Sequence, residues 1–299
     1  MIINQAALQS IYRGFKTIFN MALQAAKPLY TKVATEVPSS TKSEEYKWLG
    51  KIPKMREWVG DRVIQNLGAH DYTIKNKDWE VTIGVDRNDI EDDTIGVYTP
   101  LIQSMAESAN SHPDEIVFGL LPKGFTETCY DKKKFFASDH PVGKAKQSNL
   151  TDAPLSHTAY AAARAAMMSL TDEEGKPLNI VPNLLVVPPA LEDMGRKILM
   201  AELMVDGEKV VTNTYKGTAE LLVVPWLAAN PTQWFLMDVS KPIKPLIFQR
   251  RMKPEFVALD QPNDENVFMK KEIVYGTDSR DNAGFGLWQL AYGSTGDAQ

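Results

Sequence analysis

The sequence has a single cysteine and no long apolar run. Cys129 is the only cysteine in 299 residues, which excludes a disulfide within the chain and suits a reducing compartment. No apolar stretch reaches the roughly 18 residues that a membrane-spanning helix needs. The first residues lack an apolar core followed by a small-residue cleavage site, so we expect no secretory signal. These absences predict a protein that is assembled in the cytosol and does not enter a membrane.

Motifs that carry catalysis or bind cofactors are also missing. The sequence has no phosphate-binding loop, no zinc-ligand spacing, no hydrolase elbow and no kinase-like set of motifs. Gly284-Phe285-Gly286 is not a dinucleotide fingerprint, because no third glycine follows in a strand-to-helix context. We therefore expect no enzyme activity, no cofactor and no metal site. A structural or interaction role becomes the leading hypothesis.

One catalytic alternative stays open. A cysteine hydrolase would use Cys129 as the nucleophile and His140 as the base. Both residues lie in the loop-rich stretch 125–150, eleven positions apart, with no strand-turn-helix elbow around the cysteine. This spacing fixes no geometry, so we expect a structural thiol and a turn histidine instead.

The charge of the chain is uneven. The net charge is −5, which argues against a dedicated nucleic-acid binder. Residues 1–35 contain four basic side chains and no acidic one, so this part is +4 and the remainder is −9. A basic arm on an acidic body is typical of a segment that docks on an acidic surface, such as a neighbouring copy.

Residues 5–29 predict an amphipathic helix within this basic part. Leu8, Ile11, Phe15 and Leu29 belong to its apolar stripe, at helical spacing. Two interpretations remain open: a first helix packed on the protein's own core, or an arm that embraces a partner. Arg13 and Phe15 are therefore candidates for contacts between subunits.

The stretch Tyr46–Arg62, YKWLGKIPKMREWVGDR, interleaves aromatic and basic residues. Gly50, Pro53 and Gly60 prevent a long regular element. Each tryptophan carries about 150–250 Å² of mostly apolar surface, which such a broken loop cannot bury against itself. We expect burial on the domain or on another subunit. The contact candidates here are Tyr46, Trp48, Lys54, Arg56, Trp58 and Arg62.

The central stretch 88–124 predicts a buried helical stripe, from Ile95 to Leu120. Pro100 and Pro113 interrupt it, and each suits the first position of a helical segment. Two interpretations remain open: two or three ordinary helices, or one long kinked rod on which the flanking strands lie. Before it, alternation over 71–86 predicts two strand segments. After it, 156–170 reads as a helix, Leu184–Val187 as a buried strand followed by a helix, and 219–224 and 234–239 as strands. Near the C-terminus we expect two strands around 278–282.

Six segments together resemble the major head subunit of Mu-like phages and prophages. These are YKWLGKIPKMREWVGDR, DRNDIEDDTIGVYTP, HPDEIVF, CYDKKKFFASDHPV, PNLLVVPPALE and YGTDSRDNAGFGLWQLAYGS. The resemblance runs in order over nearly the whole chain. It implies an α+β protein with the tailed-phage (Hong Kong-type) capsid fold, which has an N-terminal arm, an extended β-hairpin loop, a peripheral domain with a spine helix, and an axial domain.

Carried onto this chain, the resemblance implies a set of domain boundaries. These are 1–38 for the arm, 39–77 for the extended loop, 78–154 for the peripheral domain with a spine helix at about 89–121, 155–240 for the axial domain, and 241–299 for a return to the peripheral domain. The implied function is that of a major capsid protein, located in the virion and assembled in the host bacterial cytoplasm.

The same resemblance implies partners. Copies of the chain would form hexamers and pentamers of an icosahedral head that encloses double-stranded DNA without sequence specificity. Scaffold, decoration and portal proteins would be further partners. An encapsulin-like compartment shell of the same fold is the alternative within this class.

Overall fold

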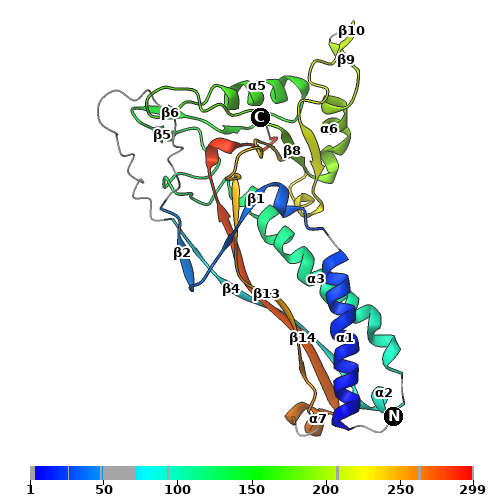
Figure 1. Ribbon diagram of the computed structural model, residues 1–299. Coiled ribbons are helices and arrows are strands. Elements are labelled where there is room, and N and C mark those ends of the chain that lie inside the picture. The colour runs from blue at the N-terminus through cyan, green and yellow to red at the C-terminus, as the bar shows by residue number, and fades with distance from the viewer. Residues whose placement is uncertain are drawn as a thin grey trace.

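Two β-sheets linked by a long helix make up an elongated molecule (Figure 1). The structure is a computed structural model that describes residues 4–25, 27–47, 49, 72–92, 94–206, 209–261 and 264–297. One sheet is long and narrow, whereas the other forms a broader end together with two helices (Figure 1). None of the helices in these ranges combines the length and apolarity needed to cross a bilayer.

The long sheet has the strand order β1-β13-β14-β4. Its strands are β1 (Ala34–Pro38), β13 (Leu246–Leu259), β14 (Glu272–Phe285) and β4 (Lys77–Asp86). β1 is parallel to β13, and the other pairs are antiparallel. β13 and β14 have 14 residues each, so this hairpin is about 45 Å long at about 3.3 Å per residue. Its register shifts between Arg250 and Glu255, where Pro254 has no N–H to donate to the ladder.

Helices cover this sheet along its length. α1 (Gln5–Ala25) lies against α3 (Thr99–Phe118), and α3 contacts β13, β14 and β4. Shorter elements flank them: η1 (Tyr30–Lys32), α2 (Arg87–Glu91), η2 (Ile95–Tyr98), α4 (Leu120–Lys123) and α7 (Glu265–Lys270), which closes the hairpin. The N-terminal helix predicted over 5–29 is confirmed, although it ends at Ala25.

The two central prolines behave differently. Pro100 lies in the first turn of α3, as expected for a residue without an N–H to donate. Pro113 lies inside α3, so of the two interpretations the helix that continues through this proline is the one found. Tertiary packing explains the difference: Pro113 and Asp114 are both buried, and the Asp114 carboxylate binds the chain that leaves α1. Contacts of this kind override the local preference of proline against helix interiors.

The second sheet has five strands in the order β11-β8-β12-β15-β7. They are β11 (Glu220–Val223), β8 (Leu184–Val187), β12 (Trp234–Met237), β15 (Ala291–Ser294) and β7 (Leu150–Thr151). Around it lie α5 (His157–Met168), η3 (Pro189–Leu191), α6 (Glu192–Leu199), η4 (Pro225–Leu227) and η5 (Trp288–Leu290). Three two-stranded antiparallel pairs lie outside these sheets: β2 (Ser43–Glu45) with β3 (Thr73–Lys75), β5 (His140–Val142) with β6 (Ala145–Gln147), and β9 (Leu203–Asp206) with β10 (Lys209–Thr212).

Several predictions for this half are confirmed and one is wrong. The strand at Leu184–Val187 is β8, all four of whose residues are buried, and the helix predicted over 156–170 is α5. The two strands expected around 278–282 are instead one continuous strand, β14. The last strand, β15, pairs with β12 in the five-stranded sheet. Residues 241–299 are therefore divided between the two sheets.

The buried apolar residues form two clusters. The larger lies around the five-stranded sheet and the adjoining ends of α3 and the hairpin. The smaller lies at the far end, between α1, α2, α3, β4 and the tip of the hairpin. Two separated cores, one at either end of α3, account for the elongated shape.

Candidate functional site

The helix α1 is anchored in the smaller core through its apolar face. Leu8, Ile11, Phe15 and Phe19 are all buried there. The Phe15 ring meets Tyr275 of β14 edge-on, with ring centroids 5.2 Å apart. Arg13 lies on the opposite, exposed face. Of these two contact candidates, only Arg13 presents its side chain to the surroundings.

Two polar joints hold the segment after α1. Asp114 of α3 accepts hydrogen bonds from the backbone N–H groups of Leu29 (3.0 Å) and Tyr30 (2.6 Å). The Tyr30 hydroxyl donates to Glu36 (2.6 Å), and Arg250 donates to both Tyr30 and Glu36 at 2.8 Å. Burial and the Glu36 hydrogen bond raise the pKa of Tyr30 to about 12. The arm from α1 to β1 is thus part of the subunit's own fold.

Tyr46 closes the base of the predicted extended loop. It is 2% exposed, and its hydroxyl donates to Gln249 Oε1 at 2.8 Å. Gln249 Nε2 in turn donates to the Ile74 carbonyl (3.1 Å) and to Asn76 Oδ1 (2.7 Å). This network ties the β2–β3 hairpin base to β13. The side chain of Tyr46 consequently has almost no surface to offer a neighbour.

The other contact candidates of this loop lie outside the described residues. They are Trp48, Lys54, Arg56, Trp58 and Arg62. Their role in contacts between subunits stays a prediction from the sequence.

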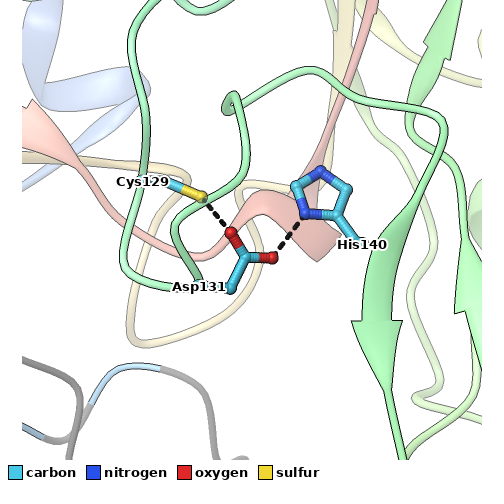
Figure 2. Close-up of side chains that lie close together, drawn as sticks. All are labelled: Cys129, Asp131 and His140. Atoms are coloured by element: carbon cyan, nitrogen blue, oxygen red, sulfur yellow. Dashed lines mark hydrogen bonds and ion pairs between the residues drawn. The ribbon is translucent and has the colours of Figure 1, made fainter. Parts of the chain in front are cut away.

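Cys129 and His140 do come together, through a residue that the sequence analysis did not include. Asp131 lies between them (Figure 2). Its Oδ1 accepts from the Cys129 thiol at 3.1 Å, and its Oδ2 lies 2.6 Å from His140 Nδ1. His140 is fully buried and begins β5, so the expected turn histidine is wrong, while the thiol is buried as expected of a structural cysteine.

The environment of His140 shows what this cluster does. Its Nε2 lies 3.1 Å from Asn149 Oδ1, and the Asn149 amide nitrogen donates to the carbonyls of Phe135, Trp288 and Ala291. Both ring nitrogens therefore face acceptor oxygens, and the ring stacks on Trp288 with centroids 3.9 Å apart. The ring is thus held in place through both of its nitrogens and through one face.

The thiol is held in its protonated form. Burial, reinforced by the adjacent Asp131 carboxylate, raises the pKa of Cys129 well above its ordinary value. Burial alone would raise the pKa of Asp131 too, but the hydrogen bonds from His140 and the Lys133 amide lower it below its usual range. A nucleophilic cysteine needs the opposite, a stabilised thiolate next to a base. The cluster has a structural role: it connects the loops of residues 125–150 to η5.

Comparison with known proteins gives the family. The chain matches the family described as Mu-like prophage major head subunit gpT over residues 8–154, 150–227 and 228–298. The chain belongs to this family. It is 35% identical over 297 residues to the major capsid protein of Escherichia phage Mu, covering 99% of this chain and 76% of that protein. It is 34% identical over 289 residues to the Mu-like prophage FluMu major head subunit of Haemophilus influenzae, covering 97% and 73%.

Solved capsids share the fold. The procapsid of bacteriophage JBD30 matches with a TM-score of 0.65 and 35% identity, covering 99% of this chain and 77% of that one. A virus-like particle from Pyrococcus furiosus matches with a TM-score of 0.51 over 94% of this chain and 98% of that one. The latter is 10% identical, so it shows the fold alone. The expected α+β capsid fold is confirmed at this level.

The protein is thus a major capsid subunit that forms the phage head, and its place is the virion capsid. It assembles with copies of itself and has a structural role, not an enzymatic one. The cysteine hydrolase alternative is wrong, in agreement with the protonated, buried Cys129. Because the family consists of phage head subunits, a phage head is favoured over an encapsulin-like compartment shell.

Large apolar side chains that the sequence analysis missed stand exposed at both ends of the subunit. Leu203 and Val210 on the β9–β10 hairpin are 60% and 66% exposed. At the far end, Val257 and Leu259 of β13 and Met269 of α7 are 47%, 55% and 69% exposed. The run Phe256–Leu259 could have revealed the second group, because four apolar residues in a row give a strand two apolar faces.

Proposed function

We propose that copies of this subunit form hexamers and pentamers that close into an icosahedral shell around double-stranded DNA. The exposed apolar side chains at the two ends of the subunit carry the proposal. Folding of the subunit removes little of this apolar surface from water. Contact with another subunit would bury it and so stabilise the assembly. The end around β9–β10 would contact other subunits of the same ring. The end around the β13 tip and α7 would contact subunits of adjacent rings.

The domain boundaries belong to the same proposal. Residues 1–38 form the arm, 39–77 the extended loop, 78–154 the peripheral domain with α3 as the spine helix, and 155–240 the axial domain. Residues 241–299 return to the peripheral domain, except that β15 pairs with β12 of the axial domain. The pairing of β14 with β13 and β4, and of β15 with β12, supports this division.

Further partners are proposed by extension from relatives. JBD30 structures include a procapsid and a capsid decorated with minor capsid protein trimers. We extend scaffold-assisted assembly, decoration and a portal protein to this chain. Because its net charge of −5 argues against strong binding to phosphates, the DNA would be enclosed by the shell without base-specific contacts.

Microscopy of two groups of variants tests the proposal. Negative-stain images of the purified wild-type chain should show rings and closed shells. Val210→Glu should prevent rings, whereas Met269→Glu should leave rings that do not close. Met168→Glu on α5, also an exposed methionine (46%), is the matched control and should assemble normally. A wild-type chain that stays monomeric at all concentrations would refute shell formation.

A further inference from the structure

The Cys129 cluster brings three kinds of metal-ligating atom together in the interior of the subunit (Figure 2). The Cys129 sulfur, an Asp131 carboxylate oxygen and a His140 ring nitrogen all lie within 4.8 Å of one another. Cys129 is 4% exposed, and the side chains of His140 and Asp131 are 0% and 6% exposed. Among the residues that the structure describes, no other group of three such side chains converges in this way. The cluster therefore meets the first requirement of a metal site.

The hydrogen bond on the far side of the imidazole determines how the ring is oriented. The Asn149 side-chain nitrogen donates to three backbone carbonyls, so its Oδ1 faces the ring and can only accept. That oxygen also accepts from the Ala137 N–H at 2.9 Å. His140 Nε2, 3.1 Å from the same oxygen, is therefore the donor. Metal-binding histidines are held in this way, with one ring N–H donated to a fixed acceptor and the other nitrogen directed at the metal.

On the near side of the ring, two electron-rich atoms face each other. With Nε2 as the donor, a neutral imidazole has its lone pair on Nδ1, which lies 2.6 Å from Asp131 Oδ2. A lone pair and a carboxylate oxygen repel each other at this distance unless a proton or a metal ion lies between them. The same carboxylate contacts the Cys129 sulfur through Oδ1 at 3.1 Å. A divalent ion bound by this carboxylate is therefore within reach of the sulfur as well.

The ligand types select zinc among the common divalent ions. Mg²⁺ and Ca²⁺ prefer oxygen ligands, whereas Zn²⁺ takes thiolate, imidazole and carboxylate ligands together. One thiolate and one carboxylate neutralise one Zn²⁺, so the occupied site leaves no net charge to bury. At zinc bond lengths of about 2.0–2.3 Å, tetrahedral ligand atoms lie about 3.3–3.6 Å apart. The 2.6 and 3.1 Å contacts would then lengthen by about 0.5–0.7 Å.

We propose that Cys129, Asp131 and His140 bind one Zn²⁺ ion, which stabilises the loops of residues 125–150 against η5. On binding, the thiol proton and any proton between Nδ1 and Oδ2 leave to solvent, and bonds from these ligand atoms to zinc form in their place. The spacing of the three ligands matches no standard zinc motif, so the sequence led us to expect no metal site. All three ligands belong to one subunit, which makes the site independent of the proposed shell.

Cobalt substitution tests the site without any mutation. The full chain is produced in medium supplemented with Zn²⁺ or Co²⁺, so that the ion is present while the subunit folds around it. The purified protein should retain about one ion per subunit, and the cobalt form should show the near-ultraviolet charge-transfer band of a cobalt–thiolate bond. Cys129 is the only cysteine of the sequence, so this band reports on this site alone. Absence of both the band and the retained ion would show that only a proton lies between His140 and Asp131, and would overturn the proposal.

Two carboxylates provide a matched pair of variants. Asp131→Asn removes a ligand, and Asp139→Asn removes the same charge from a side chain that pairs with Lys133 instead. The first should weaken zinc binding by more than the roughly 10–100-fold loss typical of an outer-shell partner, and the second should leave zinc binding unchanged.

A chelator gives a second measurement. It should lower the melting temperature of the zinc-loaded wild type, but not that of Cys129→Ser, which should also lack the cobalt band. Equal loss of zinc in both carboxylate variants, or a chelator effect in Cys129→Ser as large as in the wild type, would place the metal elsewhere and refute the proposal. A chain that binds zinc but forms no shell would refute only the proposed function.

Discussion

Replacing Asp114 by alanine should loosen the joint between the arm and α3. The carboxylate accepts two backbone N–H groups and is 7% exposed. Hydrogen bonds to a charged group contribute about 1.5–3 kcal/mol each, or roughly 3–6 kcal/mol for the pair. Burial opposes this gain and raises the pKa of Asp114 despite both bonds. We therefore expect a net loss of about 2–4 kcal/mol in the free energy of unfolding.

Asp114→Asn sharpens the test. The asparagine amide keeps one acceptor oxygen but turns an NH₂ group toward the other backbone N–H. The free energy of unfolding should therefore decrease by about half as much as in Asp114→Ala, or more. Glu115→Ala, at the exposed neighbouring acid, should change stability by less than about 0.5 kcal/mol. Assembly has to be suppressed during these measurements, because association stabilises the folded subunit.

Urea denaturation gives the global effect, and hydrogen exchange locates it. The amide protons of Leu29 and Tyr30 should exchange faster in both Asp114 variants, and remain as slow as in the wild type in Glu115→Ala. An Asp114→Asn protein as stable as the wild type, with these amides still protected, would show that the carboxylate does not anchor the arm.

Three other predictions concern the subunit itself. Phe15→Ala should cost about 3–5 kcal/mol in urea denaturation, as for other buried phenylalanines, whereas Arg13→Ala should stay within about 0.5 kcal/mol; equal losses would contradict the assignment of Phe15 to the core. Although burial opposes it, the Tyr30 hydrogen bond and Arg250 lower the pKa of Glu36. Its contribution is therefore present above the unfolded-state pKa and is lost as the pH falls through the lower folded-state pKa. Glu36→Gln should remove less than about 1 kcal/mol of this acid dependence, because the side chain is 42% exposed; an unchanged pH profile of stability would refute the assignment. The Cys129 thiol should react with an aromatic disulfide reagent only as fast as the protein opens, and rapid reaction of the native subunit would contradict its burial.

Strong local periodicity made part of the fold predictable. The strand β8 is a run of four apolar residues bounded by Asn183 and Pro188, and the helix α1 has an apolar stripe from Leu8 to Phe19. In such segments, the pattern itself reports which face is buried. The continuous strand β14 was missed because its centre, Gly276 to Asn282, reads as a polar turn. Thr277, Ser279 and Asp281 are nevertheless buried.

The Cys129 cluster shows a different limit of sequence reasoning. Eleven residues separate Cys129 from His140, and nothing local determines how that loop folds back. The path depends on Asn149, whose amide binds carbonyls of Phe135, Trp288 and Ala291. Two of those carbonyls are about 140 positions further along the chain. A contact set of that sequence separation leaves no periodic signal. The missing elbow around Cys129 pointed to a structural thiol, but the sequence did not reveal the pairing of Asp131 with Cys129 and His140.

The position of α1 changes where mutations should affect assembly. A basic arm that embraced a neighbour would lose assembly and keep subunit stability when its apolar face is altered. Because Leu8, Ile11, Phe15 and Phe19 are buried in the subunit's own core, such changes should first destabilise the subunit. In the proposed shell, contacts between copies would involve surfaces that the subunit leaves uncovered, such as the β9–β10 hairpin and the β13 tip with α7. Stability variants and assembly variants should therefore map to separate parts of the chain, with α1 in the first group.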